Sequence, residues 1–496
     1  MSFSLEALLG LIGSVVLLSV IAVRFSVRIG LPSLLIYLGI GMLLGESVLG
    51  LQFSDASLTE SLGLAALVLI LTEGGLTTRW PQVRPALGIG IALSTLAVVV
   101  SIAATGSAVH YLLGLDWRTA FLWGAVLSST DAAAVFSVLR SVAVRPRLAS
   151  ALELESGLND APVVIAVVLL AAPGPLQWWS PALVLYELAV GAAIGALFGF
   201  GGAWALRRAA LPATGLYPLA TVAVCVVGYA AGQSLHASGF LATYLAALIL
   251  GNSELPHRSS VLSFAEGTGW LAQIGLFVLL GLYASPSGLI DAVVPALVAG
   301  AVLVLLGRPL SVLVSMLPFR MPWREQAFLS WAGLRGAVPI VLAMIPLTKE
   351  PVDQQDRLLV DVVLVLVVLL TLLQGTTLPW VARLLGVAAS SEPTEIVVDA
   401  APLDELSADL LQVKVPVGSK LHGVYLNELR LPVGATVSLV VRDGAGFTPG
   451  AQTRLRERDQ LLVVTTASAR VTAERRIRAV DRAGRLARWH GETGHA

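Results

Sequence analysis

Long runs of apolar residues, separated by short polar breaks, dominate the first four fifths of the chain. A membrane-spanning helix needs about 20 mainly apolar residues, and thirteen runs have about this length. They lie near 5–23, 30–50, 58–77, 85–113, 117–141, 151–172, 181–206, 213–233, 236–252, 260–284, 289–315, 322–347 and 357–386. The first run has neither a basic start nor a small-residue cleavage site, so we interpret it as a retained helix rather than a signal peptide. The pattern predicts an all-α polytopic membrane protein.

The density of charged residues changes near residue 390. The first 390 residues contain 18 Lys/Arg and 19 Asp/Glu, whereas the remaining residues contain 14 and 13, a density typical of soluble domains. We therefore expect a membrane domain over 1–388, a linker over 389–406, a small cytoplasmic α+β domain over 407–482 and a charged tail over 483–496. Nucleic-acid-binding proteins typically carry an excess of basic residues. The net charge of this chain is zero, so we expect no nucleic-acid partner.

The basic residues between the runs predict the orientation of the chain. Fourteen of them, Arg308 included, fall in one set of alternate connections, and three fall in the other set. Lys and Arg collect in cytoplasmic loops. We therefore expect a protein of the cytoplasmic membrane, with its N-terminus outside and its C-terminal domain in the cytoplasm.

A few ionisable side chains lie inside the apolar runs, where they are costly and by default functional. The acidic candidates at membrane depth are Glu73, Asp131, Glu155 and Asp160, and the basic one is Arg335. Four acids and one base leave a negative site that a cation or a proton can neutralise. We interpret Glu155 and Arg335 as a buried structural pair.

Polar residues cluster on the sixth run. Ser156 and Asp160 are four residues apart, and Ser156 and Asn159 three apart, so a helix presents all three on one face. Pro162 cannot donate to the carbonyl of Leu158, which leaves that oxygen free. Oxygen ligands of this kind suit an alkali cation, and no thiolate or histidine accompanies them.

Two further runs are interrupted near their middle. The fifth contains Ser128-Ser129-Thr130-Asp131, whose short polar side chains compete with helical hydrogen bonds. The twelfth contains the helix breakers Gly333, Gly336 and Pro339. Broken helices near the midplane are a common means by which transporters hold ions.

Taken together, these motifs resemble the monovalent cation:proton antiporter family, in its sodium/proton exchanger-like branch. The resemblance covers about 5–388. It is carried by Thr130-Asp131, Glu155-Ser156, Asn159-Asp160 and the run from Gly333 to Pro339. It implies a homodimer of thirteen-helix subunits, each with an inverted repeat in which the fifth and twelfth helices are broken and cross.

The resemblance also implies roles for the polar residues. Asp160 would be the carboxylate shared by cation and proton, lined by Asp131, Thr130 and Ser156 and supported by Asn159, with Glu73 as a further ion-binding residue. Glu155 would pair with Arg335. An Asn-Asp pair, rather than two adjacent aspartates, implies electroneutral exchange of one cation for one proton.

The expected mechanism needs no covalent chemistry and no cofactor, so we expect a transporter rather than an enzyme. Burial disfavours a charged carboxylate and a bound cation favours it, so a proton and a cation compete for Asp160. Two alternatives are a cation channel, which would need a carbonyl filter, and an intramembrane hydrolase, which would need a catalytic histidine or paired aspartates. The sequence contains no such filter and no catalytic histidine at membrane depth, although Asp131 and Asp160 could imitate the pair.

The C-terminal region alternates between short strands and helices. We expect strands over 411–415, 436–442 and 460–465, and helices over 421–429 and 468–480. The region resembles the TrkA-C subdomain of potassium-conductance regulators, through Val415 to Ser419 and Leu429 to Pro432. This association favours K+ over Na+. It also implies either a dimerising cap without ligand or a sensor of a cytosolic nucleotide. No Gly-x-Gly-x-x-Gly run follows a strand, so NAD is not expected.

Overall fold

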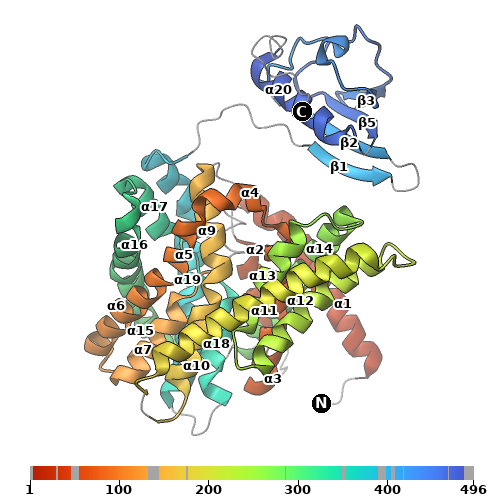
Figure 1. The fold of residues 1–496 in the computed structure, drawn as a ribbon. Coiled ribbons are helices and arrows are strands. Elements are labelled where there is room, and N and C mark those ends of the chain that lie inside the picture. The colour runs from red at the N-terminus through yellow and green to blue at the C-terminus, as the bar shows by residue number, and fades with distance from the viewer. Residues whose placement is uncertain are drawn as a thin grey trace. The chain divides into compact units, whose positions relative to one another are not determined.

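The computed structural model describes residues 4–29, 32–45, 55–131, 144–174, 177–284, 286–348, 354–388, 398–403, 408–416, 418–466 and 468–484. These residues form two compact units, Met1–Ala388 and Ala389–Ala496. Figure 1 shows that the first unit is a bundle of helices and that the second is built on a sheet.

The first half of the helical unit contains ten α-helices in its described residues. They are α1 (Leu5–Ile29), α2 (Ser33–Leu44), α3 (Ala56–Thr77), α4 (Trp80–Val83), α5 (Leu87–Ser94), α6 (Leu96–Leu113), α7 (Trp117–Ser128), α9 (Pro146–Leu158), α10 (Asp160–Ala171) and α11 (Ser180–Arg208). A 3-10 turn, η1 (Arg84–Ala86), joins α4 to α5.

The second half continues with eight α-helices and three short turns of other helix types. The helices are α12 (Leu216–Ser234), α13 (Gly239–Gly251), α14 (Arg258–Tyr283), α15 (Pro286–Val302), α16 (Arg308–Met316), α17 (Trp323–Ala332), α18 (Ala337–Met344) and α19 (Gln354–Leu384). The turns are η2 (Leu303–Gly307), η3 (Leu317–Phe319) and η4 (Pro346–Thr348).

Many of these helices are membrane-spanning in length and hydropathy. Among the described residues, eight continuous spans qualify, and a ninth is formed by α17 and α18, which are bent by 56° at a short break. Three further helices are apolar but shorter. Every run expected from the sequence contains helix, so the mostly helical, multi-pass class is confirmed, while the number of thirteen spans stays a prediction.

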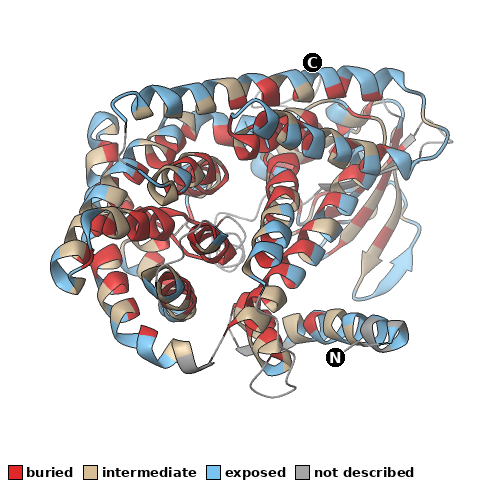
Figure 2. Cartoon of the chain, turned by 90° about the horizontal axis from the view of Figure 1, so that it is seen from below, coloured by how far each residue is buried: buried red, intermediate tan, exposed pale blue. Residues whose placement is uncertain are grey.

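The outer faces of the bundle are apolar. On α11, the side chains of Leu185, Leu197 and Phe200 are 69%, 68% and 66% exposed. Figure 2 shows buried residues where helices face one another and exposed residues on the outer sides. Apolar surface of this extent is not left in water by a soluble monomer, and it suits a lipid environment.

The helices α2 and α14 cross closely at two glycines. A Cβ at Gly41 would overlap the carbonyl oxygen of Val278, and a Cβ at Gly281 would overlap that of Leu38. Small residues permit such backbone approach in membrane bundles. Gly39, two residues from Gly41 on the same helix, has nothing within 4 Å of a built Cβ.

This contrast predicts opposite outcomes for two alanine substitutions. Gly41→Ala should lower the unfolding free energy by about 1–3 kcal/mol, because the added methyl forces the two backbones apart. Gly39→Ala adds the same methyl to the same helix in open space and should be neutral or slightly stabilising. Thermal unfolding of both purified variants in detergent measures the difference, and equal melting temperatures would contradict the close crossing.

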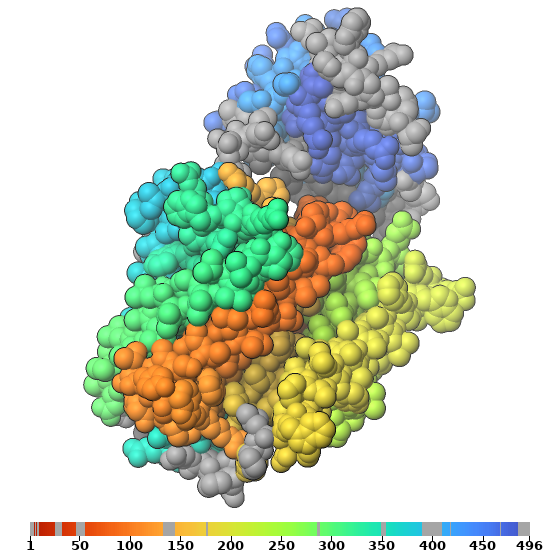
Figure 3. Space-filling model, turned by 60° about the vertical axis from the view of Figure 1, so that its left-hand side comes forward, coloured from red at the N-terminus to blue at the C-terminus, as the bar shows by residue number. Residues whose placement is uncertain are grey.

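A π-helical turn, η2, interrupts the long helix formed by α15 and α16. Such turns shift the helical register and often occur at functional sites. A Cβ at Gly307 would overlap the hydroxyl of Thr105, so α16 lies tightly against α6 here. Figure 3 shows α6 and α16 side by side. The turn ends directly before Arg308, which points into the bundle and is 5% exposed.

The end of α19 is joined to the start of α9. Val144 and Ala388 form an antiparallel β-bridge, and the backbone N–H of Arg145 donates to Val387 O at 3.3 Å. The Arg145 guanidinium bonds the carboxylate of Glu325 at the start of α17, at 2.7 Å. We call this set of contacts the α9–α19 clasp.

The second unit is a five-stranded antiparallel sheet in the order β1-β2-β5-β3-β4. The strands are β1 (Val398–Leu403), β2 (Ala408–Lys414), β3 (Ala435–Arg442), β4 (Ala445–Phe447) and β5 (Gln460–Thr466). Helix α20 (Arg470–Ala483) contributes Ala473, Ile477 and Val480 to a core of strand residues. The expected strands near 411, 436 and 460 and the final helix are confirmed.

Two expectations for this unit are wrong. The segment 421–429 is mostly turns, with a 3-10 turn, η6, only at Leu426–Leu429. The segment expected as a linker contains β1, which pairs along β2. Its sequence, Val-Asp-Ala-Ala-Pro-Leu, lacks apolar alternation, so only pairing with β2 reveals it as a strand. Most of the predicted charged tail lies outside the described residues.

An ion pair anchors the loop before β5. Both Arg442 Nε and Nη2 donate to the carboxylate of Asp459 at 2.8 Å, and Asp459 is fully buried. The backbone N–H of Arg456 also donates to Asp459, at 2.8 Å. The hydrogen bond that Arg442 donates to Asp459 raises the pKa of Arg442 above its usual value, so the guanidinium stays charged across the physiological pH range.

Candidate functional site

Two interrupted helices meet at the centre of the helical unit. Helix α7 ends at Ser128, and Ser129 is extended, with ψ of 139°. Helix α17 ends at Ala332 and α18 begins at Ala337. The backbone N–H of Asp131 donates to Leu334 O at 3.0 Å, which joins the two interruptions. The predicted break of the twelfth run is confirmed, and the fifth run loses its helix at Ser128; its course after Asp131 lies outside the described residues.

Asp131 caps the start of α18. Its Oδ2 accepts from the backbone N–H of Ala337 at 3.1 Å. Because the N-terminus of a helix carries partial positive charge, a carboxylate is stabilised there. A Cβ at Gly336 would overlap this carboxylate, so the glycine makes room for the cap.

Arg335 binds backbone oxygens at the C-terminal ends of two helices. It is 1% exposed, its Nε donates to Leu127 O at 3.1 Å, and its Nη1 donates to Gly333 O. These carbonyls terminate α7 and α17, where partial negative charge collects. The expected pair of Arg335 with Glu155 is therefore wrong, because two of the guanidinium nitrogens donate to backbone oxygens and Glu155 is paired elsewhere.

Glu155 pairs instead with Arg308. The guanidinium meets the carboxylate with both terminal nitrogens, Nη1 on Oε1 and Nη2 on Oε2, the latter at 2.8 Å. Arg308 Nη2 also donates to Leu329 O at 3.2 Å. The position of Arg308 near the end of its apolar run predicts a cytoplasmic connection, and this prediction is wrong. The span in fact continues to Phe319, which leaves Arg308 inside it.

Asp160 begins helix α10, directly after the junction at Asn159 that separates α9 from α10. It is 4% exposed, and Ser129 Oγ donates to its Oδ1 at 3.1 Å. No Lys or Arg is ion-paired with Asp160 in the part of the chain that the structure describes. Ser129 was not among the predicted site residues, and its only signal was its place in the polar run 128–131.

Other predicted residues surround Asp160 with polar atoms. Asn159 Nδ2 donates to Thr130 Oγ1 at 2.6 Å, which ties α10 to the interrupted fifth helix. The other amide atom, Asn159 Oδ1, is buried and has no hydrogen-bond partner among the described residues. Ser156 Oγ donates to Leu152 O, one turn earlier on its own helix, at 2.8 Å, so its lone pairs remain available.

A narrow cavity with about 20 Å³ of free space adjoins these groups. It brings together three of the predicted residues, Asp131, Ser156 and Asp160, and it adds Thr78, Glu153 and Tyr244, which were not predicted. The other lining residues are Leu67, Ile70, Leu71, Gly74, Gly157 and Val338. Asn159 and Thr130 contact each other beside the cavity. Glu73 does not line it: its carboxylate lies against Gly269 on α14, so a role for Glu73 stays a prediction.

Asp160, where the interrupted helices meet, is a buried carboxylate with no ion-paired base among the described residues. Arg308 neutralises the charge of Glu155. The side chains of Arg335 and Asp131 neutralise the partial charges of helix ends. Asp160, in contrast, has only the hydroxyl of Ser129 as a partner among the described residues. The described residues hold no group of three or more His, Cys, Asp or Glu able to bind a metal ion. The site therefore offers oxygen ligands and the negative charge of Asp160, which suit a monovalent cation or a proton.

Comparison with known proteins identifies two family matches. Residues 14–384 match the model for the transmembrane sodium/hydrogen exchanger, and residues 410–478 match the TrkA-C domain. The chain is 37% identical over 467 residues to the K(+)/H(+) antiporter NhaP of Alkalimonas amylolytica, covering 91% of this chain and 80% of that protein. It is 35% identical over 456 residues to the K(+)/H(+) antiporter NhaP2 of Shewanella sp. (strain MR-4), covering 90% and 79%.

More distant matches agree with these. The Na(+)/H(+) antiporter ApNhaP of Aphanothece halophytica is 30% identical over 361 residues, which is 68% of each chain. Among solved structures, the sodium proton antiporter MjNhaP1 from Methanocaldococcus jannaschii at pH 8 matches with a TM-score of 0.68 at 20% identity, covering 76% of this chain and 98% of that one. The last match concerns the fold alone.

Proposed function

This chain belongs to the sodium/hydrogen exchanger family, and on that premise we propose that it exchanges a monovalent cation, K+ in preference to Na+, for H+ across a cell membrane. The observation that carries the proposal is the isolation of Asp160, a buried carboxylate with a serine donor and no ion-paired base among the described residues. An unpaired buried charge is unfavourable, so Asp160 is stable when it holds either a proton or a cation.

Exchange follows from this competition. One carboxylate accepts either a proton or a cation, and the empty charged site crosses the membrane poorly because its charge is unpaired. Movement of the site between the two faces then couples the fluxes of the two ions. Asp131, Thr130, Ser156 and Asn159 are proposed to shape the site, and one carboxylate exchanging one charge makes the cycle electroneutral.

The preference for K+ rests on two similarities, the NhaP and NhaP2 relatives and the TrkA-C domain. In proteoliposomes with an internal pH dye and an imposed proton gradient, K+ should dissipate the gradient at lower concentration than Na+ or Li+. The rate should not change when the membrane potential is clamped, because exchange is electroneutral, whereas a channel would respond to the potential. Dissipation by Na+ but not K+ would contradict the preference, and no response to any of the three would contradict antiport.

The architecture that goes with this function is also proposed. Its elements are thirteen spans with an inverted repeat, an outside N-terminus, a cytoplasmic C-terminal unit and a homodimer. With Arg308 moved into a span, thirteen basic residues still face three across the membrane, so the predicted orientation is unchanged. Labelling of single cysteines in intact cells tests the orientation, and the mass of the protein in detergent tests the dimer.

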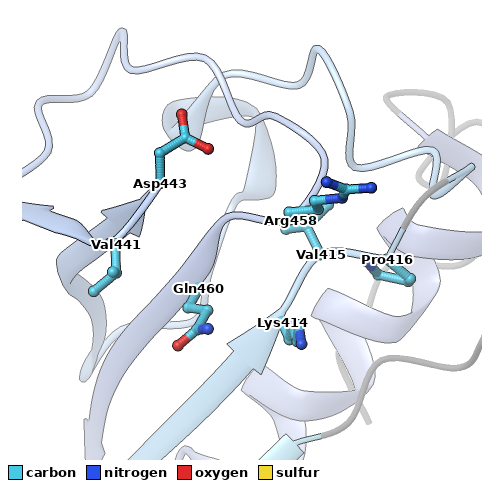
Figure 4. Close-up of a pocket in the computed structure, with 8 residues that line it drawn as sticks. Lys414, Val415, Pro416, Val441, Asp443, Arg458 and Gln460 are labelled. Atoms are coloured by element: carbon cyan, nitrogen blue, oxygen red, sulfur yellow. The ribbon is translucent and has the colours of Figure 1, made fainter.

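For the C-terminal unit, the alternatives of a ligand-free cap and a nucleotide sensor both stand. An open pocket of about 480 Å³ lies at the ends of β2, β3 and β5, with Lys414, Arg458 and Asp443 at its rim (Figure 4). Two cations against one acid favour an anionic ligand. Calorimetry of the full chain with cyclic dinucleotides tests the sensor, and Lys414→Ala should weaken any binding at this pocket.

A further inference from the structure

A second carboxylate shares the cavity that holds Asp160. Glu153 lies on α9, seven residues before Asp160, which is about 10 Å along a helix. Along the chain it lies between the start of α9 at Pro146 and Asp160, which is on the cytoplasmic side of Asp160 in the proposed topology. A cation or proton that entered from that side would meet Glu153 before it met Asp160.

Glu153 has one hydrogen-bond donor, and that donor is shared. Thr78 Oγ1 lies 2.7 Å from Glu153 Oε1 and 2.8 Å from the backbone oxygen of Gly74. A hydroxyl carries one proton and donates to one acceptor at a time. The cluster therefore has more acceptor oxygens than protons, and an added proton or cation would balance it.

A buried hydroxyl adds an independent sign of a ligand. Tyr244 is 2% exposed and lines the same cavity, and its phenolic oxygen lies near the Thr78 hydroxyl but makes no hydrogen bond of ordinary geometry among the described residues. A buried polar group without a partner is unfavourable by roughly 1–3 kcal/mol. A Cβ at Gly157 would overlap the Tyr244 ring, so the glycine gives the tyrosine its place against α9.

Among the described residues, Glu153 has no ion-pair partner. Within the described parts of the chain, neither an Arg nor a Lys is ion-paired with it, whereas the neighbouring Glu155 is fully paired with Arg308. The two acids are two residues apart on one helix and serve different purposes. Glu155 holds helices together, and Glu153 faces the cavity with unsatisfied oxygen ligands.

We propose that Glu153, Thr78 and Tyr244 form a second binding site for the monovalent cation, which the ion occupies before it reaches Asp160. The ligands are a carboxylate, a hydroxyl and a phenol, all hard oxygen groups suited to an alkali cation. With about 20 Å³ of free space, the cavity admits one water-sized guest, so the two sites are filled in turn. This inference rests on the proposed antiport and adds the path by which the ion enters.

The test compares Glu153→Gln with Glu266→Gln in proteoliposomes of defined orientation. Glu266 is an exposed carboxylate on α14 and serves as the matched control. Glu153→Gln should raise the half-saturating K+ concentration about tenfold, the effect of losing a charged ligand, and only for K+ supplied on the cytoplasmic side. Its maximal rate should stay close to that of the unmodified protein, and Glu266→Gln should change neither quantity.

A purely structural role for Glu153 would move other quantities. Loss of a contact between α3 and α9 would lower the melting temperature and change the half-saturating concentration equally on both sides. Tyr244→Phe removes one oxygen and keeps the ring, so it should give a smaller rise on the same side even if Glu153→Gln folds poorly. Unchanged or symmetric half-saturation in both variants would overturn the second site. If the unmodified protein exchanged no cation, the proposed function itself would fail.

Discussion

Replacing Asp160 by asparagine is expected to abolish cation-dependent proton exchange. Asparagine matches the shape of aspartate and can still accept from Ser129, but it carries neither the charge that attracts a cation nor a titratable proton. Asp131 is engaged with the N-terminus of α18, and the other cavity carboxylate, Glu153, lies about two helical turns before Asp160, so neither replaces the carboxylate at position 160. Proteoliposomes with the pH dye should therefore behave like protein-free liposomes at every K+ concentration tested.

A matched control separates loss of the site from loss of a buried charge. Asp361 on α19 is another carboxylate inside a span, where it lies against Gly288, and it does not line the cavity. Asp361→Asn should keep exchange within about twofold of the unmodified protein, since surface or remote substitutions have small effects. Full K+-dependent proton movement by Asp160→Asn in a correctly inserted protein would contradict the mechanism.

Removing Arg308 is expected to destabilise the protein more than any other single change in this region. The residue is buried beside Glu155, and breaking such a pair costs about 3–5 kcal/mol because the remaining charge has no partner. Arg308→Ala should therefore lower the melting temperature in detergent sharply. The double variant Glu155→Gln with Arg308→Gln should recover most of the loss, because no unpaired charge remains.

Arg335 provides the comparison for this prediction. Its partners are carbonyl oxygens at the ends of α7 and α17, so removal of a carboxylate cannot compensate for its loss. Arg335→Ala should stay destabilised when Glu155→Gln is added, whereas Arg308→Ala should be rescued. A double-mutant cycle gives both coupling energies. Rescue of Arg335→Ala alone would show that the pair lies where the sequence first suggested.

Much of the fold could be predicted because membrane helices are recognisable in a sequence by their length and hydropathy. Each apolar run contains helix in the structure, and the breakers at Gly333 and Gly336 mark the gap between α17 and α18. The gap at Ser128 had a weaker signal, since no Pro or Gly lies there. The cavity contains Asp131, Ser156 and Asp160 together. The four-residue spacing predicts this for Ser156 and Asp160, and the family resemblance implies it for Asp131.

The errors have physical causes. Arg308 was assigned to a connection because hydropathy does not reveal how far a helix continues past an arginine, and its partner across the bundle is 153 residues away. Glu153 lies near the start of its apolar run, where a charged residue is typical of a loop. It is therefore absent from the predicted site residues. Its significance depends on Thr78 and Tyr244, which come from two other helices. Contacts between side chains that are far apart in the sequence are not visible in the local sequence pattern.

The α9–α19 clasp connects the last residue of the helical unit to the start of α9. Ala388 is the last residue of the helical unit, and its β-bridge partner, Val144, stands two residues before α9. Helix α9 then continues as one rigid rod through Glu153 to the junction at Asn159. A pull on the chain at Ala388 therefore acts on the start of α9, the helix that carries Glu153.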